Sequence, residues 1–283
     1  MSGVIFFHIQ LQIAFFLRIG IKYYMNGIIS SIHFSPIKSL SFTNIESCEI
    51  KKNLGILNDR KFAFSRIIDK NKALLIEKNP NERNLDNFLS LKNSPVLNKY
   101  NFTYTDNKLT LTLGGKELIS IKADNLEQRS KLIDKLMDLE SSLMKPISLL
   151  QNSEFPFYDT SHSNKIFNSI SLINLKSIQD FERKINKKVE LQRFRGNFYI
   201  DGIDAWEERK WIGKTIKINN IYFKVEKNIP RCVAINLKPK TDDNELNLLQ
   251  SLKKNYSHFD MGVYLRALND GQIKTGYTIK IEN

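Results

Sequence analysis

Short apolar runs of strand length fill the first half of the chain after residue 25. Apolar residues alternate with polar ones or run together over 45–50 and 61–67, as expected for strands that bury one or both faces. Two further runs, 109–113 and 117–121, flank Gly114 and Gly115. A two-residue turn needs positive φ values that glycine adopts at little cost. The pattern therefore predicts a hairpin here, within a small antiparallel sheet or barrel.

The spacing of apolar residues changes between 124 and 143. Leu126, Ile133 and Leu136 recur near the period of a helix, and Asp124 is a candidate cap. The polar segment 151–168 predicts a long loop. The remaining predicted elements are helices over 175–187 and 245–255, and strands over 169–173, 198–200, 215–218, 221–225, 232–237, 262–268 and 278–281. The expected class is mainly β with a few helices (α+β).

Residues 1–25 form an apolar extension with three open interpretations. Residues 4–21 are mostly Ile, Phe and Leu, interrupted by His8, Gln10, Gln12 and Arg18. A membrane helix needs about 20 apolar residues, so an anchor is marginal. A translation start at Met25 and an ordinary helix are the other two interpretations. The chain then divides into three expected parts: 1–25, a β-barrel-like domain over 26–123, and a second domain with a connecting helix over 124–283.

The formal net charge of the 283 residues is +13. Such a charge favours polyanions such as nucleic acid or an anionic membrane. The lysines are scattered, however, which favours the alternative that the charge simply follows from a composition rich in Lys, Asn and Ile. No motif of a nucleic-acid-binding fold is present, so nucleic acid is not an expected partner.

Only two cysteines are present, Cys48 and Cys232. Their number excludes a disulfide framework and indicates a reducing compartment, so the cytoplasm is the expected location. It also excludes an iron–sulfur cluster or a structural zinc site built from several cysteines. The four histidines include no His-x-x-x-His pair.

Cys232 is the candidate for metal or nucleophilic chemistry. It follows Arg231, and a guanidinium beside a thiol favours the thiolate, the form that binds soft metals. A buried structural cysteine is the alternative for a lone Cys at the start of a predicted strand.

Three basic segments are candidate anion sites. Arg193 and Arg195 would share one face of a strand, which Asn197 continues. Lys38 and Ser39 follow a proline turn, and Arg60 ends an Asn-Asp-Arg turn. A solvated basic edge is the alternative for each.

These fragments occur in an order that resembles a known family. Residues 34–39 (FSPIKS) and 54–62 (LGILNDRKF) resemble two elements of the N-terminal β-barrel that precedes MOSC domains. The second half resembles the MOSC domain itself, and the whole resembles the amidoxime-reducing branch of that family from about residue 26 onward. The matching blocks are 193–197 (RFRGN), 201–202 (DG), 205–208 (AWEE) with Trp211, 231–232 (RC), 239–241 (PKT), 259–264 (FDMGVY) and 271–276 (GQIKTG).

The resemblance implies a molybdenum cofactor and assigns residues to it. Cys232 corresponds to the cysteine that ligates molybdenum. The implied contacts to the pterin phosphate are Lys38, Ser39, Arg60, Arg195 and Asn197, with Arg193 and Arg231 beside them. Gly196, Pro230 and Tyr277 depart from the family pattern, and Gly196 is expected to loosen the backbone beside the anion site.

The implied activity is that of a molybdenum-dependent oxidoreductase that reduces N-hydroxylated or related N-oxygenated small molecules. Two cysteines cannot hold a ferredoxin-type cluster, so electrons are expected from a separate donor protein. The alternative is a non-catalytic carrier of the cofactor or of sulfur, as in MOSC sulfurases, and pyridoxal phosphate binding is implied only at the level of the family. Membrane contact is expected only if residues 1–25 act as an anchor.

Overall fold

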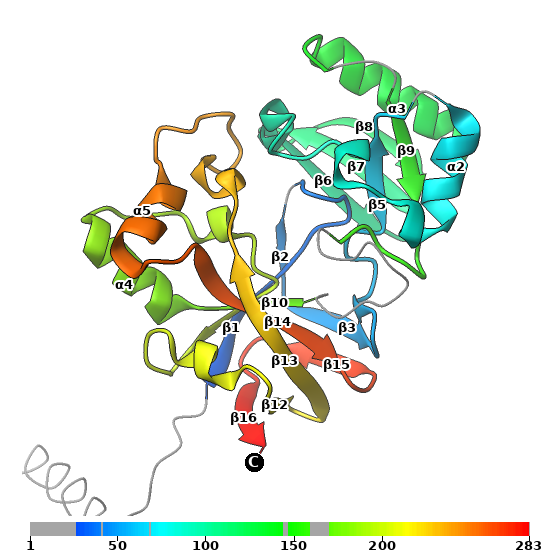
Figure 1. Ribbon diagram of the computed structural model, residues 1–283. Helices are drawn as coiled ribbons and strands as arrows, with labels where there is room; N and C mark the ends of the chain where they lie inside the picture. The colour runs from blue at the N-terminus through cyan, green and yellow to red at the C-terminus, as the bar shows by residue number, and fades with distance from the viewer. Residues whose placement is uncertain (1–26, 41, 68, 144–146, 159–169, 283) are drawn as a thin grey trace, which may run out of the picture.

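A computed structural model describes residues 27–282 except 41, 68, 144–146 and 159–169. Its two lobes are a closed barrel and a smaller α+β lobe (Figure 1). The expected class, mainly β with a few helices, is confirmed. The interpretations of residues 1–25 fall outside the described residues. None of the helices in the described ranges is long and apolar enough to cross a membrane.

Seven strands close the barrel in the order β11-β10-β14-β13-β12-β16-β1, and β1 pairs with β11 to complete the ring. The β10–β11 pair is parallel and the other pairs are antiparallel. The short strand β2 extends β1 outside the ring. The strands are β1 (Gly27–Phe34), β2 (Thr43–Ile45), β10 (Ile170–Asn174), β11 (Phe198–Asp201), β12 (Thr215–Ile218), β13 (Ile221–Pro230), β14 (Asp260–Ala267) and β16 (Thr278–Glu282).

The barrel core follows from the alternation of its strands. In β13, Ile221, Phe223 and Val225 are fully buried while the residues between them are not. Apolar residues of the other strands meet them in one continuous cluster. Two helices, α4 (Leu175–Ile185) and α5 (Leu248–Tyr256), cover one side.

The smaller lobe packs two helices against short sheets. Its core joins Phe62, Phe64, Phe102 and Leu136. A further sheet, β15-β3-β4, lies beside the barrel. The elements are β5 (Phe62–Ser65) paired with β9 (Ser148–Gln151), the meander β6 (Tyr100–Thr105), β7 (Lys108–Leu113) and β8 (Lys116–Lys122), the helices α2 (Lys70–Lys78) and α3 (Leu126–Leu139), and β3 (Ser47–Lys51), β4 (Gly55–Ile56) and β15 (Gly271–Lys274).

Strand pairing crosses the sequence division expected at residue 123. The first strand, β1, lies between β11 and β16 of the C-terminal half. Likewise β3 pairs with β15. The division of the chain into domains stays a prediction, but the barrel that carries the C-terminal strands also contains 27–34.

The predicted strand over 232–237 is wrong. The strand is instead β13, which ends at Pro230, and a 3-10 turn, η6 (Val233–Asn236), follows Cys232. The reason is that this apolar run has no neighbouring strand: only Ile235 and Leu237 are buried, while Val233 is 47% exposed. Cys232 therefore begins a turn and is exposed.

Candidate functional site

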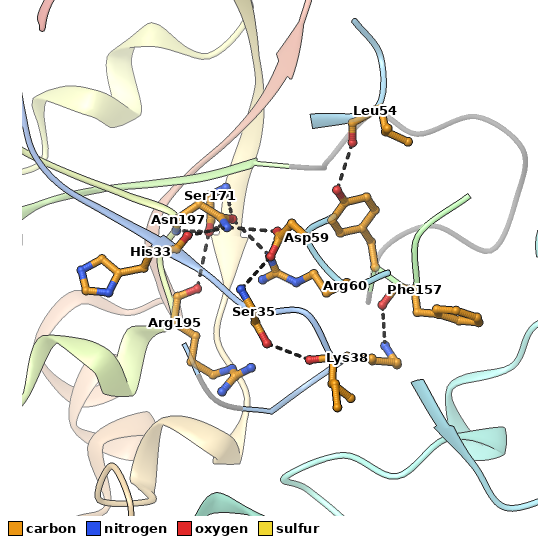
Figure 2. Close-up of polar contacts among 12 residues, drawn as sticks. His33, Ser35, Lys38, Leu54, Asp59, Arg60, Phe157, Ser171, Arg195 and Asn197 are labelled. Carbon is orange, nitrogen blue, oxygen red and sulfur yellow. Dashed lines mark hydrogen bonds and ion pairs between the residues drawn. The ribbon is translucent and has the colours of Figure 1, made fainter. Parts of the chain in front are cut away.

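Three loops meet where the barrel faces the smaller lobe (Figure 2). The first follows β1 and carries residues 35–40. The second, residues 58–60, lies between β4 and β5, and the third, residues 195–197, precedes β11. Together they bring Lys38, Arg60, Arg195 and Asn197 into one region, although these residues are far apart in the sequence.

Asn197 is the centre of this junction. Its side chain is 1% exposed. Nδ2 donates to the carbonyl oxygen of His33 and to Asp59 Oδ2, both at 3.1 Å. Oδ1 accepts from Ser171 N at 3.1 Å, from Ser171 Oγ at 2.9 Å and from Arg60 Nη1 at 3.4 Å. The amide thus ties strands β1 and β10 to the 58–60 loop, and its hydrogen-bonding groups are all engaged within the protein.

Asp59 is a fully buried carboxylate at the base of the same loop. It accepts from the Ser35 backbone N–H at 2.9 Å and pairs with Arg60. Burial raises the pKa of Asp59, while the Arg60 charge and the Ser35 hydrogen bond oppose that rise. The carboxylate consequently fixes Arg60 at the junction.

Two guanidinium groups lie against the ring of Phe42. The Arg60 group lies 4.8 Å and the Arg195 group 4.7 Å from the ring centroid. Arg195 Nη2 also donates to the carbonyl oxygen of Leu40 at 2.7 Å. Cation–π contacts of this kind hold a guanidinium in place without neutralising its charge. Two guanidinium groups are therefore held close together at the junction, with the Asp59 carboxylate beside that of Arg60.

Lys38 is a buried lysine, 2% exposed. Its Nζ lies 3.5 Å from the carbonyl oxygen of Phe157 and 5.7 Å from the centroid of the Phe88 ring. Ser39 follows it and is half-buried. Both residues lie on the loop from the barrel, yet the Lys38 ammonium reaches residues of the smaller lobe.

Several residues of the junction have left-handed backbones. The φ angles are 59° at Ser39, 52° at Arg60 and 52° at Arg195. A non-glycine residue in this region costs about 1–2 kcal/mol, and such residues gather at binding and catalytic sites. The surrounding hydrogen bonds hold these three side chains in positions that an extended loop would not give them.

Arg231 connects the thiol-bearing segment to this junction. Its Nη1 donates to the carbonyl oxygen of Phe194 at 2.7 Å, and its Nε donates to that of Met261 at 2.9 Å. Burial lowers the pKa of Arg231. The guanidinium bonds both the 191–197 segment and β14, so it fixes the position of the exposed Cys232 relative to Arg195.

The expectation that Arg193 and Arg195 share one face is wrong. Residues 191–194 form a 3-10 turn, η4 (Leu191–Phe194), and Arg195 has a left-handed backbone. Arg193 instead bonds Glu190 Oε2 and the carbonyl oxygen of Asn236, each at 2.6 Å.

The expectation that Gly196 loosens the backbone is also wrong. Its amide donates to the Tyr199 hydroxyl at 3.0 Å, and a Cβ there would meet Ile173 Cδ1 at 2.7 Å. The close approach of Ile173 explains why a residue without a side chain is present.

Sequence reasoning missed the roles of Phe42, Ser171 and Phe157. Phe42 and Phe157 carry no signal of their own, because an isolated aromatic residue in a loop resembles any other core residue. Asp59 stood beside Arg60 in the predicted anion turn, but its role as a buried partner depends on Ser35 and Asn197, which come from other parts of the chain.

Comparison with known proteins bears on the second half of the chain. The family model for the MOSC domain matches residues 159–280. The segment 159–280 of the chain is thus similar to the MOSC domain. The barrel strands β10 to β14 and the first residues of β16 lie within the matched segment, as do Arg195, Asn197 and Cys232.

Matches to individual proteins have low sequence identity or cover only part of the chain. Mitochondrial amidoxime reducing component 2 of Rattus norvegicus is 33% identical over 94 residues, which cover 33% of this chain and 25% of that protein. The match thus spans a quarter of the length of that relative. Among solved structures, the YuaD protein of Bacillus subtilis gives a TM-score of 0.44 at 8% identity, covering 91% of this chain and 96% of that one. YiiM of Geobacillus stearothermophilus gives 0.34 at 15% identity, covering 41% and 55%.

Proposed function

We propose that this protein binds a molybdenum cofactor at the junction of its lobes and uses it to reduce N-oxygenated small molecules. The observation that carries the proposal is the arrangement around Arg231. The Arg231 side chain donates to the carbonyl oxygen of Phe194, just before Arg195 and Asn197 in the sequence. Arg231 is also the residue before Cys232, whose side chain is exposed. A thiol for a soft metal and cations for a phosphate thereby belong to one rigid unit.

The residues present fit such a cofactor chemically. Its phosphate is an anion, and Lys38, Arg60 and Arg195 supply cations at the junction, with Ser39 as a further donor. Its metal accepts a thiolate, and Cys232 is the exposed cysteine of the chain, since Cys48 is buried. Within the described ranges there is no cluster of three or more His, Cys, Asp or Glu side chains that would suit a different metal.

The protein residues have distinct proposed roles. Cys232 would hold the metal, and Arg60 and Arg195 would bind the phosphate. Asn197 and Asp59 would act as positioning residues because their polar groups are engaged with the protein. When bound, the cofactor would supply two-electron redox chemistry at the metal.

The balanced reaction requires a reductant. Conversion of an N–OH group to N–H consumes two electrons and two protons and releases one water molecule. We propose that a separate electron-donor protein supplies the electrons, because the chain's two cysteines cannot bind an iron–sulfur cluster with four cysteine ligands.

The test compares two cysteine variants of the full chain, expressed in a host that makes the pterin cofactor. We expect stoichiometric molybdenum and reduction of an N-hydroxyamidine in the wild type, and loss of both in Cys232→Ser. Cys48→Ala is the matched control, because it removes the other thiol, which lies on β3 opposite Ile273 and is buried. Absence of molybdenum from the wild type, or full molybdenum content in Cys232→Ser, contradicts the proposal.

The exposure of Cys232 also favours a second candidate, a sulfur carrier that holds a persulfide on this thiol. Cyanide-labile sulfur bound to Cys232 without reductase activity would support the carrier in place of the enzyme. Both candidates lose their function in Cys232→Ser, so the readouts, molybdenum with reductase activity or cyanide-labile sulfur without it, distinguish them.

A further inference from the structure

A cavity of about 720 Å³ opens between the two lobes beside the candidate cofactor site. One wall comes from the barrel side, with Arg193, Arg195 and Lys240. The other comes from the smaller lobe, with Lys99 and the tip of the β7–β8 hairpin. A cavity of this size suits a small organic ligand, for which about 300–1,000 Å³ is usual.

The charges that line the cavity are all positive. Four cationic side chains line it, and none of the lining residues is a carboxylate. Arg193 is 5% exposed; its Nε and Nη1 bond Glu190 and Asn236, while its Nη2 makes no hydrogen bond with a described residue. Since fixed cations in a concave site attract anions strongly, the lining favours an anionic ligand.

The carboxylates that pair with these cations do not line the cavity. Lys99 pairs with Glu140 at 2.8 Å and with Asp242 at 3.9 Å, and Arg193 pairs with Glu190, but none of the three carboxylates is among the lining residues. Lys240, whose backbone is left-handed with φ of 63°, makes no ion pair with a described residue. The cationic groups are therefore nearer to a ligand in the cavity than their counter-charges are.

The wall also has an apolar portion. Phe42, Leu91, Leu113, Ala234 and Leu237 line the cavity together with the cations. If an inorganic ion occupied the cavity, these apolar side chains would remain in contact with water. A ligand with an apolar body and one anionic head would use both kinds of surface.

This cavity is distinct from the proposed cofactor site. Lys38, Ser39, Arg60 and Cys232 do not line it. Phe42 lies between the two regions, because Arg60 and Arg195 both contact its ring. Only two of the candidate cofactor residues, Arg193 and Arg195, are shared.

Hydrogen bonds from Asn98 to residues 238 and 241 connect the two lobes beside the cavity. Asn98, which lines it, donates through Nδ2 to the carbonyl oxygens of Lys238 at 2.8 Å and Thr241 at 2.6 Å. These bonds hold the turn that presents Lys240. The side chains of both lobes are thus positioned before a ligand binds, which lowers the entropic cost of binding.

We infer that the interlobe cavity is a second ligand site, which binds a small amphipathic anion with a carboxylate or phosphate head on Arg193, Lys99 and Lys240. The apolar body of the ligand lies against Phe42 and Leu237. The inference does not depend on molybdenum, so its test and that of the proposed function succeed or fail separately.

The test titrates the full chain with phenyl phosphate and with benzoate at constant ionic strength, followed by calorimetry and by the thermal midpoint. We expect saturable binding of at least one probe, and the tighter of the two identifies the head group. The double variant Lys99→Gln/Lys240→Gln should weaken binding at least tenfold, because charge-assisted contacts are lost. Lys240→Gln alone should weaken it less and serves if the double variant does not fold.

A control variant makes the result specific. Lys187→Gln/Lys254→Gln removes the same charge from exposed positions outside the cavity and should retain wild-type affinity. The inference is overturned if neither probe saturates, if Lys187→Gln/Lys254→Gln weakens binding as much as Lys99→Gln/Lys240→Gln does, or if Lys99→Gln/Lys240→Gln keeps wild-type affinity.

Discussion

Replacement of Asn197 by alanine should destabilise the whole junction between the lobes. The side chain is 1% exposed and bonds β1, β10 and the 58–60 loop. After truncation, Asp59 keeps its contact with Arg60. The Ser171 N–H and the His33 carbonyl oxygen instead lose their side-chain partner in a buried region.

The magnitude follows from those two groups. A buried polar group without a partner costs about 1–3 kcal/mol, so Asn197→Ala should lower the free energy of unfolding by about 2–6 kcal/mol. The corresponding fall in Tm is on the order of 10 °C for a chain of this size. Urea unfolding followed by circular dichroism measures the free energy. Asn255→Ala, on the exposed face of α5, is the matched control and should change it by less than about 0.5 kcal/mol.

A second substitution tests the electrostatic part of the reasoning. Asn197→Asp keeps the acceptor for Ser171 but removes the Nδ2 group that lies 3.1 Å from Asp59 Oδ2. Two carboxylates then face each other, which raises the pKa of the pair in the folded state. A raised folded pKa adds stability at low pH that is lost as pH rises, so the deficit of Asn197→Asp should shrink as pH falls from 7 to 4.5. The reasoning is refuted if Asn197→Ala matches the Asn255→Ala control, or if the Asn197→Asp deficit is the same at both pH values.

Two further predictions concern the barrel. Burial lowers the pKa of His33 to about 4 from 6.5, so its neutral ring contributes stability above pH 6.5 that is lost as pH falls towards 4. The loss of stability is up to about 3 kcal/mol. The free energy of unfolding of His33→Gln should therefore fall less between pH 6.5 and pH 4 than that of the wild type. An equal pH dependence in the variant and the wild type contradicts the prediction. Gly262 has φ of 82°, and an added Cβ would overlap the carbonyl oxygen of Leu172 in β10. Gly262→Ala should therefore lower the free energy of unfolding by about 2–4 kcal/mol more than Gly115→Ala does. Gly115 is the matched control, because its φ is 84° and an added Cβ would meet nothing within 4 Å. Equal thermal midpoints for the two variants would rule out the steric contact.

The local elements of the fold could be predicted from the sequence because their signals are local. The turn at Gly114 and Gly115 has the positive φ values that the glycines indicated, 58° and 84°. The hairpin at Asn219 is present as well, with φ of 53°. The predicted helix over 175–187 is present as α4, with Asn174 as its cap.

The non-local features could not be predicted from spacing. The strand β1 alternates like any half-buried strand, and nothing in residues 27–34 indicates that its partners are β11 and β16. The faces of Arg193 and Arg195 depend on one left-handed residue. The position of Cys232 after a strand depends on where β14 begins, since Pro230 pairs with Asp260, the first residue of β14, and the Arg231 N–H donates to the carbonyl oxygen of Phe259 just before it.

The resemblance to MOSC proteins supplied what spacing could not. It grouped Lys38, Arg60, Arg195 and Cys232 before any contact was known, and the structure brings the three cationic residues to one junction. The resemblance did not distinguish residues that would contact a ligand from residues that only position those contacts through hydrogen bonds within the protein. Asn197 illustrates the difference, because its amide is fully engaged with the protein.

The place of β1 in the barrel has a consequence for synthesis in the cell. Gly27 is synthesised about 250 residues before Ile279, its partner in β16. At about 5–20 residues per second, this strand waits on the order of tens of seconds for the strand that completes the ring. During that time its apolar face and its backbone edge are open to other chains. The nascent protein should therefore depend on chaperones more than its modest size suggests, whereas the smaller lobe, whose strands β5 to β9 are all made earlier, can fold while the barrel is still incomplete.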